Sequence, residues 1–158
     1  MIPGNAAIHL FYCSNSLTEG ELERLRARFG DDGLKMLSLP CSGKMTIPYL
    51  LKAFEKGADA VVICSCLDAE CKHLEGGLRA SRRAGAVDEL MEEIGLGKGR
   101  VLMVMKRQSE IQKVIDGIES LRAGALVASP PSSAKPARVV RTTIRSSTSA
   151  GDRRENAA

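Results

Sequence analysis

The apolar residues of the chain fall into four short runs, each followed by a segment in which apolar residues recur every three or four positions. The runs cover residues 8–13, 34–39, 60–65 and 101–105. Their length and their content of Val, Ile and Leu predict β-strands. The third run is almost continuously apolar, which is typical of a central parallel strand buried on both faces.

The segments that follow the runs have the periodicity of amphipathic helices. Gly30, Gly57 and Gly124 are natural stops for three of them. The third helical segment extends over residues 73–94, with Gly85 as a candidate interruption. The apolar positions that define the four helices are Leu22, Leu25 and Phe29; Ile47, Leu50, Leu51 and Phe54; Leu74, Leu78, Val87, Leu90, Met91 and Ile94; and Ile111, Val114, Ile115, Ile118 and Leu121.

Four alternating strand–helix units predict an α/β fold, a three-layer sandwich with a four-stranded parallel sheet and right-handed crossovers. We expect a flavodoxin-like strand order of 2-1-3-4 in a single domain that covers residues 1–125. Residues 126–158 are rich in Pro, Ser and Arg and hold few large apolar side chains. This tail is expected to be disordered when alone, although Val139, Val140 and Ile144 would suit an extended segment bound to a partner.

Composition narrows the class of protein. Aromatic residues make up only 3% of the 158 residues, so the core must be aliphatic. No run of about 18 apolar residues occurs, and the N-terminal segment lacks the basic and apolar regions of a secretory signal, so we expect a cytoplasmic protein without a membrane span. In that setting the five cysteines are expected to be free, catalytic or metal-bound rather than a disulfide framework.

The positive net charge is confined to the tail. From residue 125 onward the chain has six basic and two acidic side chains, a difference that equals the net charge of +4 of the whole chain. Residues 1–124 carry 17 basic and 17 acidic side chains and are therefore neutral. This balance argues against broad nucleic-acid binding by the folded part.

Four cysteines follow the ends of predicted strands. Cys13, Cys41 and Cys66 come at or directly after three of the runs, and Cys71 follows in the next loop. Because parallel strands end at the same edge of a sheet, where ligands bind in such folds, these thiols are expected to converge. An iron–sulfur cluster needs about four thiolates in one place, while the bland alternative is that each Cys is a small buried hydrophobe.

The spacing of the cysteines excludes some kinds of site and leaves others open. The run of closely spaced cysteines found in bacterial-type ferredoxins is absent, and no C-x2-C pair supports a zinc ribbon or a thioredoxin-type dithiol. Two colourless alternatives stay open: a thiol–disulfide redox protein that uses Cys66 and Cys71, and a zinc-stabilised assembly module. Cys64 lies two residues before Cys66, about 6–7 Å deeper along the strand, and is interpreted as a packed core thiol and as the substitute if another cysteine is not a ligand.

Basic residues flank the expected cysteine site. Arg79, Arg82 and Arg83 could dock an acidic partner or offset the charge of a thiolate-bound centre, or they could form an ordinary solvated helix face, and Lys44 is open to the same interpretations.

Two histidines and a glycine-rich segment give no indication of a catalytic or binding role. His9 is interpreted as a packing residue and His73 as an exposed residue near a helix start. The glycine-rich residues 95–100 match neither phosphate-binding motif and are interpreted as a helix-to-strand turn.

Five motifs together resemble a known family. They are Phe-Tyr-Cys at 11–13, Cys-Ser-Gly-Lys at 41–44, Ala-Phe-Glu-Lys-Gly-Ala-Asp at 53–59, Cys-x4-Cys at 66–71, and Gly-Gly-Leu-Arg-Ala-Ser-Arg-Arg at 76–83. Over residues 8–122 the chain resembles the delta, or iron–sulfur, subunit of methyl-viologen-reducing (F420-non-reducing) hydrogenases. Two family cysteines are replaced by Tyr12 and Ser16, and residues 67–70 replace a His-Pro-Gly-Asp stretch of the family.

The resemblance implies a cofactor, a role and partners. It implies one [2Fe–2S] cluster with Cys13, Cys41, Cys66 and Cys71 as ligands. It also implies an electron-transfer subunit without substrate chemistry of its own. Such a subunit would relay electrons between a heterodisulfide-reductase-type flavoprotein and a hydrogenase, formate dehydrogenase or other reductase, within a hetero-oligomer.

Overall fold

The computed structural model describes residues 6–124, and the tail expected at 126–158 lies outside the described residues. The sheet has four parallel strands in the order β2-β1-β3-β4, which confirms the predicted order. The strands are β1 (Ile8–Cys13), β2 (Leu34–Leu39), β3 (Ala60–Cys66) and β4 (Val101–Lys106), and the helices are α1 (Glu19–Gly33), α2 (Ile47–Glu55), α3 (Gly76–Glu93) and α4 (Ile111–Arg122).

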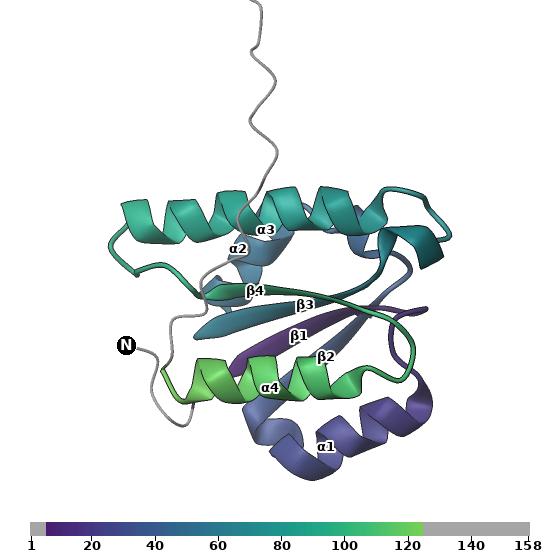
Figure 1. The fold of residues 1–158 in the computed structure, drawn as a ribbon. Coiled ribbons are helices and arrows are strands. Elements are labelled where there is room, and N and C mark those ends of the chain that lie inside the picture. The colour runs from purple at the N-terminus through teal and green to yellow at the C-terminus, as the bar shows by residue number, and fades with distance from the viewer. Residues whose placement is uncertain (1–5, 125–158) are drawn as a thin grey trace, which may run out of the picture.

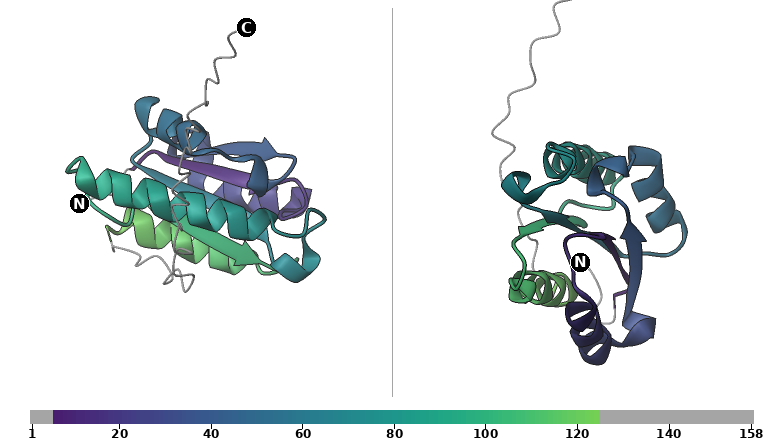
Figure 2. Two further views of the ribbon diagram at one scale, coloured as in Figure 1. Left: turned by 90° about the horizontal axis from the view of Figure 1, so that it is seen from above. Right: turned by 90° about the vertical axis from the view of Figure 1, so that its right-hand side faces the viewer.

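The helices form one layer on each side of the sheet, which confirms the predicted three-layer α/β sandwich. Helices α2 and α3 cover one face, and α1 and α4 cover the other (Figure 1 and Figure 2). Alternation along β3 explains how one strand serves both layers. Val62 and Cys64 belong to the core beneath α1 and α4, whereas Val61 and Ile63 belong to the core beneath α2 and α3.

Local signals in the sequence account for the helix ends. The Thr18 side chain accepts a hydrogen bond from the Glu21 backbone, and the Glu21 carboxylate accepts one from the Thr18 backbone, so α1 begins with a capping box. The Thr46 side chain caps α2 in the same position. Gly30 has a φ of +67° and interrupts the helical backbone of α1 three residues before the element ends, as its role as a stop predicts.

Helix α3 differs from its prediction at the N-terminal end. It begins at Gly76, and Leu74 lies before it in a turn, 80% exposed, with a φ of +59°. Gly85 does not interrupt the helix, because a glycine inside a long helix weakens it without breaking it. The buried stripe is Ala80, Ala84, Val87 and Met91. The first half of this stripe is made of alanines, which give a weak hydrophobic signal. The prediction therefore placed the more apolar Leu74 and Leu78 on the buried face and began the helix too early.

The glycine-rich segment between α3 and β4 is a turn, as predicted. Gly95, Gly97 and Gly99 all have φ between +81° and +83°. The buried Asp88 carboxylate accepts hydrogen bonds from the backbone of Gly99 and of the next two residues, at 2.9–3.2 Å. The turn therefore has a structural role, which fits its lack of a phosphate-binding motif.

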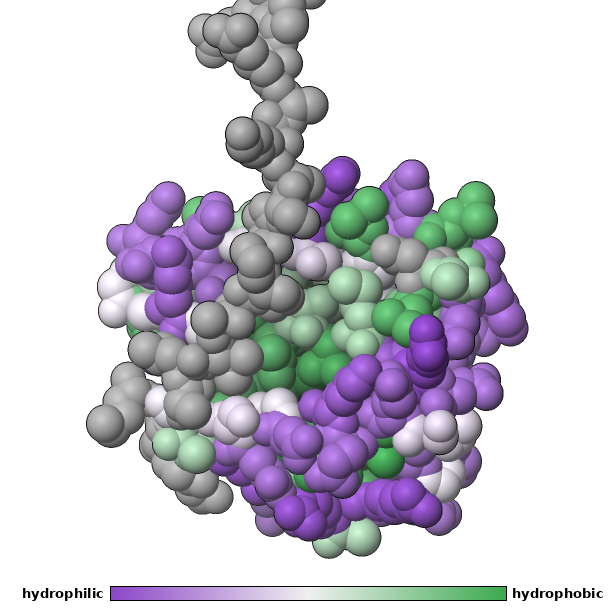
Figure 3. Space-filling view, viewed as in Figure 1, coloured by the Kyte–Doolittle hydropathy of each residue, from purple (hydrophilic) through white to green (hydrophobic). Residues whose placement is uncertain are grey.

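One edge of the sheet is partly open to the surface. In Figure 3 hydrophobic side chains gather between α3 and α4, over the edge strand β4. Met103 and Met105 of that strand are half-buried. Among the helices of residues 6–124, none is both long and apolar enough to span a bilayer.

Candidate functional site

Two of the predicted site cysteines meet at the ends of neighbouring strands. Cys13 is the last residue of β1 and Cys66 is the last residue of β3, and these strands pair in the sheet. Their sulfurs are 3.9 Å apart, and both residues are buried. The topology therefore brings together two thiols that are 53 positions apart in the sequence.

The other two cysteines form a second pair around Gly76. Cys41 lies just after β2, and Cys71 lies in the loop that precedes α3. A Cβ atom placed on Gly76 would be 2.7 Å from the Cys41 sulfur and 3.1 Å from the Cys71 sulfur. The two sulfurs are therefore no farther apart than the sum of these distances, and only a glycine leaves the space between them open.

The backbone around Cys41 is tightly packed and has a donor aimed at the sulfur. Gly43 donates its backbone N–H to the Cys41 sulfur at 3.4 Å, within the short 3-10 turn Ser42–Lys44. A Cβ on Gly43 would be 2.9 Å from the Cα of Gly76, so the two glycines allow the turn and the start of α3 to approach. This cradle suits a bulky group that several thiolates hold while backbone N–H groups face its sulfur.

The two pairs are linked by proximity and by charge. The Cys13 sulfur is 3.8 Å from the carbonyl oxygen of Pro40, the residue before Cys41. Burial raises the pKa of the Cys66 thiol to about 12, and the neighbouring Cys13, followed by Cys71, adds to the effect. The Cys66 thiol is therefore protonated at neutral pH, and a bound metal cation would be needed to hold it as a thiolate.

As they stand, the thiols form two pairs and not one closed set. Within residues 6–124, no three side chains of His, Cys, Asp or Glu are arranged to hold a single metal ion. Cys64 takes part in neither pair. It is fully buried in the core beneath α1 and α4, where burial raises its pKa to about 11.

Two contacts that the sequence did not indicate hold the site together. The buried hydroxyls of Ser42 and Ser65 are 2.8 Å apart and join the Cys41 turn to the end of β3. Arg83 donates from its Nη1 atom to the carbonyl oxygen of Gly43 at 2.8 Å and to that of Met45. Since neither contact follows from local sequence, only the tertiary structure could identify them.

The structure separates the arginines that the sequence grouped together. Arg83 braces the Cys41 turn and is half-buried, so it is not a free docking residue. Arg79 is exposed and forms an ion pair with Glu75 at 3.2 Å, and Arg82 is exposed. His73 is exposed, whereas His9 is buried and its pKa is lowered by burial and by nearby lysines. Both histidines agree with their predicted roles.

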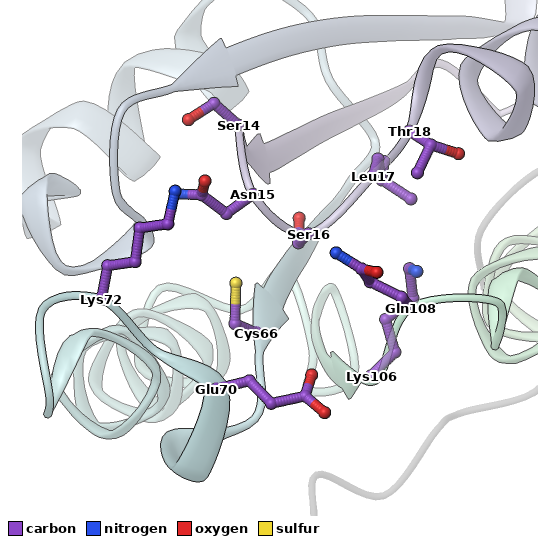
Figure 4. Close-up of a pocket in the computed structure, with 10 residues that line it drawn as sticks. All are labelled: Ser14, Asn15, Ser16, Leu17, Thr18, Cys66, Glu70, Lys72, Lys106 and Gln108. Atoms are coloured by element: carbon purple, nitrogen blue, oxygen red, sulfur yellow. The ribbon is translucent and has the colours of Figure 1, made fainter.

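Two cavities flank the cysteines on either side of the loop that carries Cys71. One, of about 390 Å³, lies between the loop after β1 and the end of β4, and the Cys66 sulfur is directed into it (Figure 4). The other, of about 360 Å³, is lined by Cys41, Gly76 and three basic side chains. Lys72 lines both cavities, so the loop separates them.

The fold and the site define a class of protein, a small parallel α/β domain with four thiols at the carboxyl edge of its sheet. Residues 8–124 match the family described as methyl-viologen-reducing hydrogenase, delta subunit. The chain belongs to this family, as the motifs in its sequence indicated.

Named relatives agree with this assignment. The chain is 34% identical over 90 residues to the iron–sulfur subunit of the F420-non-reducing hydrogenase vhu of Methanocaldococcus jannaschii, a match that covers 57% of this chain and 67% of that protein. It is 28% identical over 92 residues to the protein of the same name from Methanopyrus kandleri, covering 58% and 70%. One of the subunits of a ferredoxin:CoB-CoM heterodisulfide reductase of Methanosarcina mazei is 29% identical over 68 residues, which is 43% of this chain and 9% of that much longer protein.

Proposed function

We propose that the protein is an electron-transfer subunit with one [2Fe–2S] cluster, held by Cys13, Cys41, Cys66 and Cys71. The observation that carries the proposal is that four thiols form two pairs, Cys13 with Cys66 and Cys41 with Cys71 around Gly76. Both pairs lie at the edge of the sheet where α/β folds bind ligands. Membership of a family whose relatives are named iron–sulfur subunits supports the same cofactor.

The grouping of the thiols favours a cluster with two metal atoms. A [2Fe–2S] cluster is held by four thiolates, two on each iron. Cys13 and Cys66 form one pair, and Cys41 and Cys71 form the other. We assign one pair to each iron, which explains why no single-ion site is gathered among the described residues.

The residues of the chain would set the properties of this centre. When bound, a [2Fe–2S] cluster accepts and releases single electrons. Three of the four cysteines are buried residues, which limits their contact with bulk water, and the Gly43 N–H donates toward the Cys41 sulfur. Both the burial and the hydrogen bond are means by which a protein adjusts the potential of such a centre.

The partners that we propose follow from the relatives. The match to a segment of a heterodisulfide reductase supports an association with a flavoprotein of that type. The names of the other relatives support a second partner of the hydrogenase class, or another dehydrogenase or reductase. The protein would relay electrons between the two within a cytoplasmic hetero-oligomer.

Two other functions make different predictions for the same cysteines. A thiol–disulfide protein that uses Cys66 and Cys71 would be colourless, and it is not favoured, because the sulfur that contacts Cys66 is that of Cys13. A zinc-stabilised assembly module would also be colourless and would unfold when the metal is chelated.

Anaerobic purification tests the proposal directly. The expected product is coloured, holds about two irons and two sulfides per chain, and gives a rhombic EPR signal after reduction by dithionite. Serine variants of each proposed ligand should lose the cluster, whereas Cys64→Ala should keep it. A colourless protein that takes up no iron on reconstitution would overturn the proposal.

A further inference from the structure

We propose that the surface around the Cys41–Cys71 pair is the docking site for a partner redox protein. The partner would present an acidic face with an apolar socket that receives Leu74. This inference rests on the proposed function and names the chemistry of the partner that exchanges electrons with the cluster. Three side chains make up what we call the basic rim: Lys44, Lys72 and Arg79.

The basic rim gives the surface beside Cys41 a local positive charge, although the folded part is neutral overall. All three side chains line the cavity of about 360 Å³ beside Cys41, and no carboxylate is among the described side chains that line it. Lys44 and Lys72 are exposed and form no ion pair with another described side chain. Arg79 is paired with Glu75, but both side chains are more than 60% exposed, so water screens that pair and a stronger partner could replace it.

Leu74 is an apolar anchor within this charged surface. It is 80% exposed, and its φ of +59° lies in the left-handed region, which is unfavourable for a residue with a branched side chain. Its backbone N–H donates to the carbonyl oxygen of Cys71 at 3.1 Å, so the turn that exposes the leucine is tied to a proposed ligand. Leu78, the third residue of α3, lies four positions after Leu74 and is 37% exposed. Residues with a strained backbone are found most often at functional sites.

The position of this surface suits electron transfer. The basic rim and Cys41 line the same cavity, so a partner seated there would lie directly against one thiol pair. Complementary charge would speed the encounter, and a buried apolar anchor would fix the orientation. A nucleic acid is the less suitable occupant, because it offers no socket for Leu74 and because the folded part is neutral overall.

Small redox ions test the charge of the surface without any partner protein. The full chain is reconstituted and reduced, and its oxidation by hexacyanoferrate(III), an anion, and by hexaammineruthenium(III), a cation, is followed by stopped flow. We expect the double variant Lys44→Glu/Lys72→Glu to react about tenfold more slowly with the anion and faster with the cation. The matched control is Lys52→Glu/Lys56→Glu, at the opposite end of α2, which should leave both rates nearly unchanged.

Binding of a partner tests the anchor. The probe is the purified heterodisulfide-reductase-type flavoprotein of the same organism, and its affinity for the chain is measured by calorimetry at two salt concentrations. Leu74→Ser should weaken binding about tenfold and leave the rates with both small ions unchanged, whereas the lysine variant should weaken binding mainly at low salt. Equal affinity for the wild type and both variants would overturn the proposal.

The design separates this inference from the proposed function. If the wild type holds no cluster, the proposed function fails, and the binding experiment still tests the docking surface on the metal-free chain. If the wild type and all variants hold the same amount of iron but bind the flavoprotein equally well, the cluster stands and the docking surface fails. If the lysine variant binds the flavoprotein as well as the wild type does but binds duplex DNA or RNA less well, the surface serves the other class of partner and the proposal is contradicted.

Discussion

Arg83 holds the turn that carries Cys41, because its Nη1 atom donates a hydrogen bond to the Gly43 carbonyl oxygen at 2.8 Å. The same atom donates to the carbonyl oxygen of Met45. Gly43 in turn donates its N–H to the Cys41 sulfur, so the guanidinium group acts on the sulfur through a single residue, Gly43. Arg83 is thus a positioning residue for the candidate site.

The first prediction concerns this arginine. A hydrogen bond to a charged group contributes about 1.5–3 kcal/mol. Because both bonds of Arg83 come from the same half-buried Nη1 atom, Arg83→Met should destabilise the fold by about that amount in total. It should also change the EPR line shape and shift the reduction potential, and Arg83→Lys should restore part of both. Arg82→Met is the control, since Arg82 is exposed, and it should change stability by less than about 0.5 kcal/mol. A cluster with the same potential in Arg83→Met would contradict a positioning role.

The second prediction concerns the glycine between the sulfurs. Gly76→Ala would place a methyl group 2.7 Å from the Cys41 sulfur and 3.1 Å from the Cys71 sulfur, so we expect the variant to fold but to hold little or no iron. Gly85→Ala is the matched control in the same helix, because nothing lies within 4 Å of its added Cβ. Alanine should there stabilise the helix by about 1 kcal/mol and leave the iron content unchanged. Iron content and circular dichroism measure the two effects.

The sequence predicted the strands, helices and cysteines that form this site, but few of the tertiary contacts that hold them in place. The four short apolar runs and the glycine stops identified the layers, and the rule that parallel strands end at one edge brought Cys13 and Cys66 together. That rule could not group the thiols into pairs, because the positions of Cys41 and Cys71 depend on how the loop before α3 folds back over the Ser42–Lys44 turn.

Leu74 shows why local pattern fails at such a place. Its spacing from Leu78 matches a helix, and nothing in the pattern marks a left-handed backbone at a leucine. The Arg83 contact was missed for a related reason, since an arginine on a helix is usually solvated and its partners are backbone groups 38–40 positions away. Residues whose roles depend on tertiary contacts are thus the ones that sequence reasoning misplaced.

The third prediction concerns a buried ion pair beside the site. Lys106 is fully buried and Glu21 is 8% exposed, and their side chains are 2.9 Å apart. Burial alone would raise the pKa of Glu21, but hydrogen bonds from Thr18 and the charge of Lys106 outweigh it and lower the pKa. Because the folded-state pKa is depressed, the stability from this group is present above the unfolded value of about 4.3 and is lost as the pH falls through the folded value.

Urea unfolding of the metal-free protein between about pH 7 and pH 3 measures this effect. The free energy of unfolding of the wild type should fall steeply below about pH 4.5. Glu21→Gln should be less stable near neutral pH, by up to about 3 kcal/mol, because it leaves the buried Lys106 without its counter-charge. Its pH dependence should also be shallower. Parallel pH curves for the two proteins would contradict the assignment to Glu21.

The fourth prediction concerns the thiols when no metal is bound. The sulfurs of Cys13 and Cys66 need to move from 3.9 Å to about 2 Å to form a disulfide, so mild oxidation of the metal-free protein should link these two cysteines first. The thiolate is the reactive form, and burial raises the pKa of Cys66 to about 12. The modification of Cys66 should therefore accelerate about tenfold for each unit of rising pH between neutral and alkaline conditions. Peptide mapping by mass spectrometry identifies the bond, with Cys13→Ser as the variant that cannot form it. A bond between Cys66 and Cys71 in the wild type would instead support the thiol–disulfide function, since that protein requires these two residues to pair.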